Sequence, residues 1–168
     1  MMQVNINAAV LANNLPRLAQ NSEVSQPEEV FKVIYLNSQH QIIDTADLAE
    51  GTINSGAISP REVIENAIKN YAVSLIFAHN HPSGNSEPSR GDKEVTRDLV
   101  YAASIMRIKV LDHIIIGNNR YFSFAGAGLI EEYGLSFLNL KTKGVAEPKR
   151  RRYRAELLDD KPPWAEGR

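Results

Sequence analysis

Two histidines, a serine and an aspartate lie close together in the stretch AHNHPSGNSEPSRGDKEVT, residues 78–96. Its content of proline, glycine and serine is typical of a loop rather than of a helix or strand. His79 and His81 flank one residue at the end of an extended segment, and the two-residue period of a strand puts both imidazoles on the same side. That spacing suits two nitrogen ligands of one metal ion.

Asp92 supplies a carboxylate in the first turn of the next predicted helix, where the Pro/Gly loop can return it toward the imidazoles. Two histidines and one carboxylate leave a fourth tetrahedral position for water, which is how catalytic zinc is held. Zinc in such a site lowers the pKa of its water toward about 7. Hydrolysis would further require a general base and a donor for the oxyanion.

Each part of this motif also has a plainer interpretation. An H-x-H pair in a loop can consist of exposed polar residues that bind nothing. Ser89 followed by Asp92 is also a capping pair, which stabilises a helix by about 1 kcal/mol without metal. The conjunction favours the metal site, because H-x-H-P, the serine and the aspartate all stand between a predicted buried strand and a capped helix.

The composition restricts the chemistry further. The absence of cysteine excludes disulfides, thiolate zinc sites, iron–sulfur clusters and cysteine nucleophiles, and it excludes zinc deaminase chemistry, which requires cysteine ligands. The adjacent letters HNH do not indicate an HNH nuclease, whose residues are spread over a ββα unit. A net charge of −1 gives no global field that would attract nucleic acid. The first 20 residues resemble neither a signal peptide nor a membrane span, so we expect a cytoplasmic protein.

The elements that must position these residues alternate between strands and helices. Apolar segments predict a buried strand at EVFKVIYL, a hairpin partner at IIDTADL and a third strand at GTINSGAI. Ser59 as N-cap, Pro60 and Glu62 as capping-box partner predict a helix to about Asn70. The side chains expected on its buried face are Val63, Ala67 and Tyr71.

The next segments lead into and away from the histidines. VSLIFA predicts a buried strand that ends at His79, and Ser89 predicts the N-cap of a second helix. The apolar stripe of that helix is Val95, Leu99, Ala103 and Met106. KVLDHIIIG, a turn at Asn118 and Asn119, and RYFSF predict a final hairpin. Interleaved strands and helices favour an α/β fold.

We predict a domain at residues 29–140, preceded by an extension at residues 1–28 and followed by a charged tail at residues 141–168 that is disordered when alone. The tail contains the basic run from Lys149 to Arg154, which is a candidate for weak contact with phosphates. Its acidic neighbours nearly cancel this charge, so we expect contact of the tail with nucleic acid to be weak. For the core, the net charge of −1 predicts little affinity for nucleic acid.

The stretch HNHPSGNSEPSRGD resembles the JAMM motif of the MPN/JAB metallopeptidases, H-x-H-x7-S-x2-D, and specifically the RadC-like branch. GTINSGAISPREV and VLDHIIIGNNRYFSF are similar to RadC-like proteins too. The resemblance covers about residues 29–135. Many members of that branch carry an N-terminal helix-hairpin-helix region for which residues 1–28 offer no room, so the family name gives only weakened support to a DNA-linked role.

The resemblance implies an MPN/JAB-type, cytidine deaminase-like fold: a curved mixed β-sheet flanked by helices. It also implies Zn²⁺ held by His79, His81 and Asp92. By the same resemblance Ser89 would help to stabilise the tetrahedral intermediate, and Glu29, at the start of the first core strand, would be the general base. The implied activity is that of a zinc metallopeptidase acting on peptide or isopeptide bonds of a peptide or protein substrate.

Alternatives remain for the function and for single residues. The chain could instead be a non-catalytic MPN-like scaffold or a DNA-repair-associated module that binds nucleic acid. Glu62 and Glu50 compete with Glu29 as the base, although capping explains the first and a solvated turn the second. His113 is a candidate fourth ligand, but a histidine in an apolar strand is more often a hydrogen-bonded core residue. His40 is expected to be exposed in a polar turn.

Overall fold

A five-stranded mixed sheet forms the centre of the fold in the computed structural model, which describes residues 29–50, 58–118 and 120–143. The strand order is β2-β1-β3-β4-β5, with β3 and β4 parallel and the other neighbours antiparallel. The strands are β1 (Val30–Leu36), β2 (Ile42–Glu50), β3 (Ser74–Asn80), β4 (Lys109–Gly117) and β5 (Arg120–Ser123). The predicted α/β class with a mixed sheet is confirmed.

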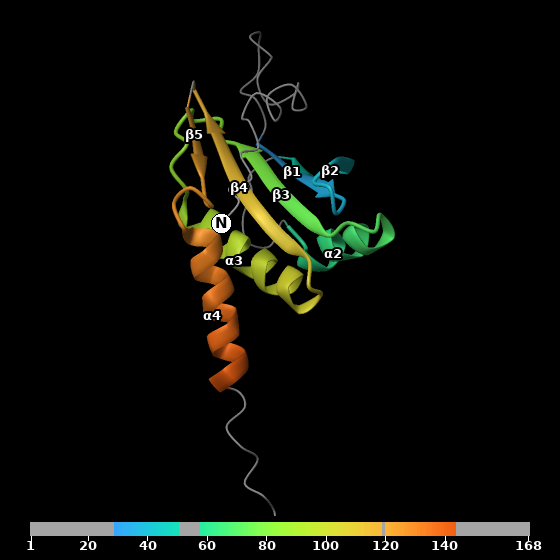
Figure 1. Ribbon diagram of the computed structural model, residues 1–168. Helices are drawn as coiled ribbons and strands as arrows, with labels where there is room; N and C mark the ends of the chain where they lie inside the picture. The colour runs from blue at the N-terminus through green and yellow to red at the C-terminus, as the bar shows by residue number, and fades with distance from the viewer. Residues whose placement is uncertain (1–28, 51–57, 119, 144–168) are drawn as a thin grey trace, which may run out of the picture. The chain divides into compact units, whose positions relative to one another are not determined.

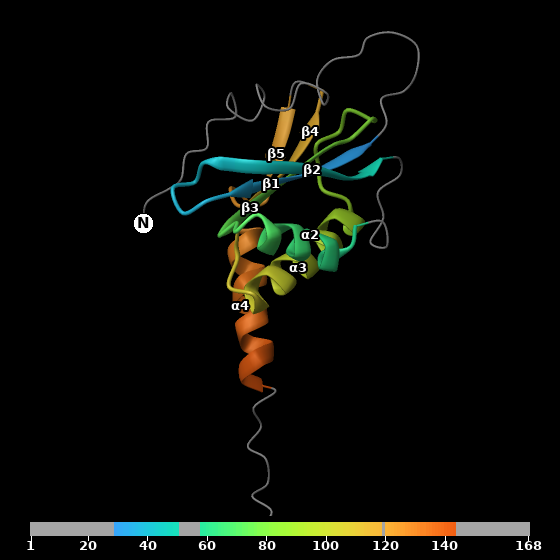
Figure 2. The same ribbon diagram turned by 90° about the vertical axis from the view of Figure 1, so that its right-hand side faces the viewer.

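Two helices pack side by side on one face of this sheet, as Figures 1 and 2 show. They are α2 (Pro60–Lys69) and α3 (Arg90–Ile105), and α3 makes the crossover between the parallel strands β3 and β4. Parallel neighbours need such a long connection, because a tight hairpin can join only antiparallel strands. The crossover carries the chain from the end of β3, through the predicted site, into α3.

The strands next to the site are buried on both faces. Residues on the helix-covered face of β1 and β3 include Phe31, Val33, Tyr35, Leu75 and Phe77. The alternate residues form a second cluster on the opposite face, namely Ile34, Leu36, Ile76 and Ala78. Burial on both faces explains why the sequence of these strands is apolar without alternation. It also gives His79, in β3, and His81, just after that strand, a rigid support.

The helix predicted from Ser59 exists, but two details of that prediction are wrong. The Ser59 side chain makes no capping hydrogen bond, so the expected capping box with Glu62 is absent. Val63 and Ala67 are buried as expected, whereas Tyr71 is 88% exposed. The helix ends at Lys69 and Tyr71 has φ 55°, so the chain has left the helical path before Tyr71 could extend the buried stripe.

The helix predicted from Ser89 is confirmed, together with most of its apolar stripe. Val95, Leu99 and Ala103 are buried, while Met106 is 48% exposed. Met106 is the C-cap of α3, beyond its last helical residue, so the periodicity no longer determines which way its side chain points.

A third helix that the sequence did not lead us to expect, α4 (Leu129–Lys143), follows the final hairpin. Tyr133 in its first half joins a buried cluster with Ile115 and Phe124. The expected third strand at residues 51–58 falls mainly outside the described residues. So do the extension at residues 1–28 and the tail beyond residue 143, and the predicted domain boundaries stay predictions.

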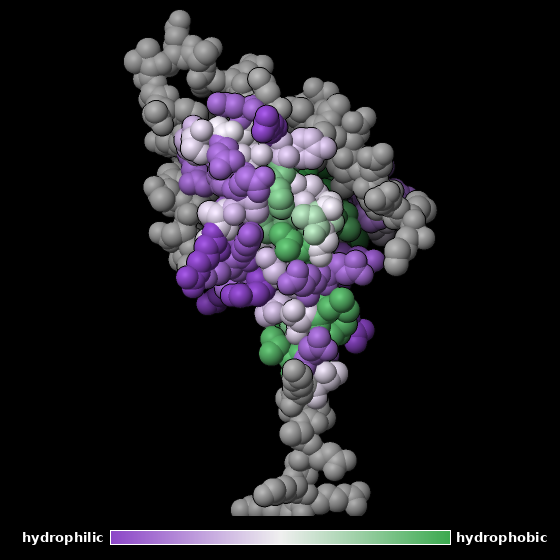
Figure 3. Space-filling model, turned by 90° about the vertical axis from the view of Figure 1, so that its left-hand side faces the viewer, coloured by the Kyte–Doolittle hydropathy of each residue, from purple (hydrophilic) through white to green (hydrophobic). Residues whose placement is uncertain are grey.

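The described helices are too short or too polar to cross a lipid bilayer. Figure 3 shows one face of the molecule, on which the described residues are mainly hydrophilic and hydrophobic areas are smaller.

Candidate metal centre

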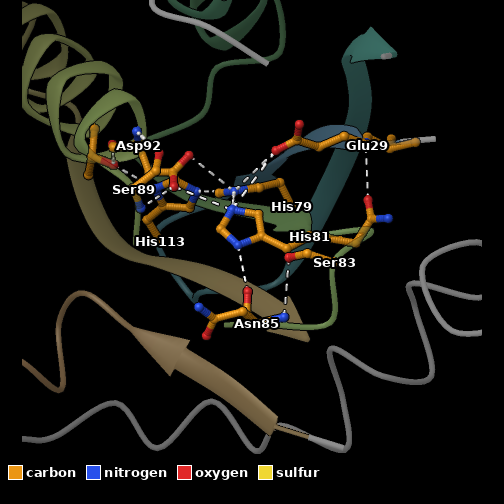
Figure 4. A network of polar contacts seen from close by, with 11 residues as sticks. Glu29, His79, His81, Ser83, Asn85, Ser89, Asp92 and His113 are labelled. Atoms are coloured by element: carbon orange, nitrogen blue, oxygen red, sulfur yellow. Dashed lines mark hydrogen bonds and ion pairs between the residues drawn. The ribbon is translucent and has the colours of Figure 1, made fainter. Parts of the chain in front are cut away.

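Four side chains from three parts of the fold converge beside the end of β3. Glu29 directly precedes β1, His79 lies in β3, His81 follows that strand, and Asp92 is in the first turn of α3. One ligand atom from each lies within 4.8 Å of the others (Figure 4). The structure therefore brings together the three predicted metal ligands and the predicted base, whereas their roles stay predictions.

The distances rank the two carboxylates. The Nε2 atoms of His79 and His81 are 2.9 Å apart. Asp92 places Oδ1 3.3 Å from the first of these nitrogens and Oδ2 3.3 Å from the second. Glu29 Oε1 lies 3.8 Å and 3.9 Å from the same two nitrogens. Asp92 is thus the nearer carboxylate to both imidazoles, and Glu29 is the more distant one.

A backbone contact fixes which nitrogen of His81 carries the proton. His81 Nδ1 is 2.7 Å from the carbonyl oxygen of Asn85. A carbonyl oxygen can only accept, so Nδ1 is the donor and a neutral His81 has its lone pair on Nε2. The loop is held for this contact by backbone hydrogen bonds from Gly84 to His81 and from Asn118 to Gly84.

The donor set fits a zinc ion. Two imidazole Nε2 atoms at 2.9 Å repel each other if both present lone pairs, and a bound cation would relieve this repulsion. Imidazole nitrogen with carboxylate oxygen is a donor set that zinc accepts, and the chain has no cysteine that would compete. The described residues therefore offer a group able to hold a metal, formed by Glu29, His79, His81 and Asp92.

The charge of Asp92 is set by opposing influences. Burial alone would raise the pKa of the Asp92 carboxyl, but His79, when its ring is protonated, and hydrogen bonds from Ser89 outweigh burial and hold the pKa well below the ordinary value. Asp92 is 4% exposed, so this carboxylate is ionised while almost sealed from water. Metal ligation requires that form.

Ser89 stands beside the cluster and caps α3. Its hydroxyl accepts from the backbone N–H of Asp92 at 3.1 Å, and its own backbone N–H donates to Asp92 Oδ2 at 2.6 Å. The capping interpretation of this pair is therefore confirmed, and it orients the carboxylate. Ser89 also lines one groove together with Glu29, His81 and Asp92. Its proposed part in catalysis stays a prediction.

The remaining candidates are not members of the group of four. Glu62 is exposed on α2, and the side chain of Glu50 is outside what the structure describes. His40 is exposed in its turn, as predicted. His113 is completely buried, and its Nε2 lies 2.8 Å from His79 Nδ1, on the side of that ring away from the cluster. His113 is therefore a hydrogen-bonded core residue, the interpretation that the sequence favoured over a fourth metal ligand.

The sequence did not reveal two residues that support the histidines. Asn85 contacts His81 through its backbone carbonyl. Every residue has such a carbonyl, so the residue type gives no indication of this contact. Thr96 places its hydroxyl 2.6 Å from His113 Nδ1. The one available sign for Thr96 was its position one helical turn after Asp92, on a buried stretch of α3.

The loop that carries Asn85 packs against the β4–β5 hairpin through Gly117, and we expect Gly117→Ala to loosen it. A Cβ on this residue would lie 2.4 Å from the carbonyl oxygen of Gly84 and 2.9 Å from the amide nitrogen of Ser86. Both are backbone atoms, so the loop itself must move. The free energy of unfolding should fall by about 1–3 kcal/mol in urea denaturation, as for other overpacked sites.

Gly91→Ala is the matched control. A Cβ there would meet only Ser89 Oγ, at 3.6 Å, which is an ordinary contact. Because Gly91 lies in α3, alanine should leave stability unchanged or raise it by up to about 1 kcal/mol. Equal stability of the two variants would show that the loop tolerates displacement at Gly117.

Comparisons with known proteins agree with this arrangement. The family model described as a RadC-like JAB domain matches residues 8–129. A UPF0758 protein of Actinobacillus succinogenes is 48% identical over 110 residues, which are 65% of this chain and 50% of that protein. A UPF0758 protein of Pseudoalteromonas translucida is 52% identical over 103 residues, 61% of this chain and 46% of that protein. The chain spans about half the length of these curated relatives.

Proposed function

The chain belongs to the RadC-like JAB domain family, and on that premise we propose that it is a zinc-dependent hydrolase of the JAMM type that cleaves a peptide or isopeptide bond. The observation that carries the proposal is the group formed by Glu29, His79, His81 and Asp92, with ligand atoms within 4.8 Å of one another. A scaffold without catalysis would have no need for this set.

His79, His81 and Asp92 would hold the metal. Zinc, when bound, supplies Lewis acidity: it polarises a substrate carbonyl and makes water more acidic. The chain contributes two neutral imidazoles and one ionised carboxylate on a buried strand end and a capped helix. Because these supports are rigid, little reorganisation is needed to keep the donors in place.

Glu29 is the proposed general base. Its carboxylate faces the same two Nε2 atoms as Asp92 but lies farther away, at 3.8 Å and 3.9 Å against 3.3 Å. That difference supports a role as proton acceptor for water at the site rather than as a ligand. Its side chain is 16% exposed, so water can reach it. The proton would pass from the attacking water to the carboxylate and then to the leaving amine.

Ser89 is the proposed donor to the developing oxyanion. Its oxygen already accepts from the Asp92 amide, which orients the hydroxyl group while leaving it a proton to donate. The residue lines the same groove as Glu29 and Asp92. A substrate carbonyl seated there would meet this hydroxyl as negative charge develops on its oxygen.

The substrate would enter along the loop at residues 82–88. Two grooves lie along this loop. Glu29, His81 and Asp92 line the first groove. Asn118, Arg120 and Tyr121, from the region of the β4–β5 hairpin, line the second. Ser83, Asn85 and Glu87 line both grooves. An extended peptide lying over these shared residues would place one backbone carbonyl at the metal group and its neighbouring side chains in the two grooves.

The test is metal analysis combined with a peptide-library cleavage assay on the purified chain. We expect one zinc ion per chain and cleavage that disappears on chelation and returns when zinc is restored. Isopeptide-linked substrates should be included beside linear peptides. A protein that binds zinc stoichiometrically but cleaves no member of either library would favour a scaffold function instead.

A further inference from the structure

His113 is a completely buried histidine that uses both ring nitrogens. Its Nε2 is 2.8 Å from His79 Nδ1, and its Nδ1 is 2.6 Å from the hydroxyl oxygen of Thr96. Thr96 is also fully buried, and its hydroxyl donates to the backbone carbonyl of Asp92. Three side chains thus form an unbroken series of hydrogen bonds that starts and ends at residues of the metal group.

The direction of every proton in this series follows from its last member. The Asp92 carbonyl can only accept, so Thr96 donates to it and the Thr96 oxygen is left to accept from His113 Nδ1. A neutral His113 with its proton on Nδ1 has a lone pair on Nε2. That lone pair accepts from His79 Nδ1, which leaves the Nε2 of His79 without a proton.

His113 is held in one ring orientation. It is completely buried, and its hydrogen-bond partners are a hydroxyl and an imidazole, an environment that favours the neutral ring. Its ring stacks on Phe124 at 4.8 Å and 15° and meets Phe77 edge-on at 6.0 Å and 89°. These aromatic contacts fix the plane of the ring. A 180° flip within that plane would place carbon atoms opposite Thr96 and His79, so both hydrogen bonds would be lost.

We propose that Thr96 and His113 are positioning residues that fix His79 in the tautomer whose Nε2 lone pair faces the metal. The opposite tautomer of His113 would donate to His79 Nδ1 and put the proton of His79 on Nε2, where it blocks ligation. The backbone carbonyl of Asp92 therefore sets the state of one metal ligand while its side chain serves as another. The proposal rests on the metal site proposed above.

The key variant is Thr96→Val, which keeps the branched shape and removes the hydroxyl. His113 Nδ1–H then loses its acceptor, so the preference for this tautomer falls. Zinc affinity, measured by competition with a chromogenic chelator at fixed pH, should fall about 10-fold or more, within the range known for supporting residues of metal ligands. Thr96→Ser restores a hydroxyl at the same place and should recover most of the affinity.

A second measurement needs no metal. Nitrogen NMR of histidine in the metal-free protein, at a pH well above the ordinary histidine value of about 6.5, distinguishes protonated from unprotonated ring nitrogens. We expect an unprotonated Nε2 and a protonated Nδ1 for His79 in the wild type and in Thr96→Ser. In Thr96→Val the Nε2-protonated form should become populated. A protonated Nε2 of His79 in the wild type would overturn the proposal, even if no variant folds.

Ala103→Gly controls for lost stability. It removes a buried methyl group from α3 in the main core cluster, apart from the hydrogen-bond series, and should destabilise the fold by about 1 kcal/mol through helix propensity. Its zinc affinity and His79 tautomer should match the wild type. If Thr96→Val kept full affinity, or if Thr96→Ser failed as badly as Thr96→Val, the hydroxyl would have no such role. The NMR result stands independently of whether the wild type binds zinc, so the two proposals can fail separately.

Discussion

Replacing Glu29 with glutamine is expected to slow hydrolysis by about 10²-fold or more while the zinc content stays unchanged. Glutamine has nearly the same shape but cannot accept a proton from water. Glu29 also lies farther from both Nε2 atoms than Asp92 does, so its loss should leave the ligands in place. The measurement is the cleavage rate of any peptide found in the library assay, together with metal content by mass spectrometry.

Glu62→Gln is the matched control for this substitution. Glu62 is exposed on α2 and is not part of the metal group, and the capping box expected with Ser59 is not formed. Rate and metal content of this variant should equal those of the wild type. An active Glu29→Gln protein would exclude Glu29 as the base, and a metal-free Glu29→Gln protein would make it a ligand.

Replacing His81 with alanine is expected to remove the metal. The loss should exceed the roughly 10–100-fold weakening that follows when only a supporting residue of a ligand is changed. His81 is the better choice of the two histidines, because its side chain is 13% exposed and lies past the end of β3, whereas His79 is buried in the strand. The fold should therefore survive, and native mass spectrometry should find the chain without zinc.

His40→Ala is the control for loss of a histidine. His40 lies in the exposed turn between β1 and β2, apart from the metal group. Its zinc occupancy should equal that of the wild type. Full occupancy in His81→Ala would contradict the assignment of the ligands, and loss of zinc in both variants would point to an effect on folding.

The strands and the capped helix α3 could be predicted because their signals are local. A run such as VSLIFA is apolar because both faces of β3 are buried, and Ser89 with Asp92 forms the expected capping box. The relation of His79 to His81 follows from the geometry of a strand. These predictions needed no knowledge of what packs against each segment.

The predictions that were wrong depend on where an element ends. Tyr71 and Met106 continue the apolar spacing of α2 and α3, but both lie beyond the last helical residue and are exposed. The end of α2 is set by β3, since Val73 donates to the carbonyl of Leu36 and starts the sheet pairing. Periodicity within one helix contains no information about that neighbour.

The position of Glu29 beside the histidines depends on how distant strands pair, which the sequence does not reveal. β1 and β3 pair with Phe31 opposite His79, and this pairing brings Glu29 beside the histidines. The resemblance to a family implied Glu29 as the base. No local sequence pattern shows that Glu29, rather than Glu62 or Glu50, lies close to the histidines. The same holds for Thr96 and His113, which meet only because α3 packs on β4.

The crossover from β3 through α3 to β4 has a consequence for the order of folding. It contains His79, His81, Asp92, Thr96 and His113, so every proposed ligand and both positioning residues belong to one contiguous segment. Closing the loops among the ligands costs little chain entropy, whereas Glu29 must be recruited across a much longer stretch. We therefore expect zinc to bind to partly folded chains before the hairpin of β1 and β2 docks. During refolding, zinc binding should then be complete before Glu29 reaches the site and hydrolysis begins.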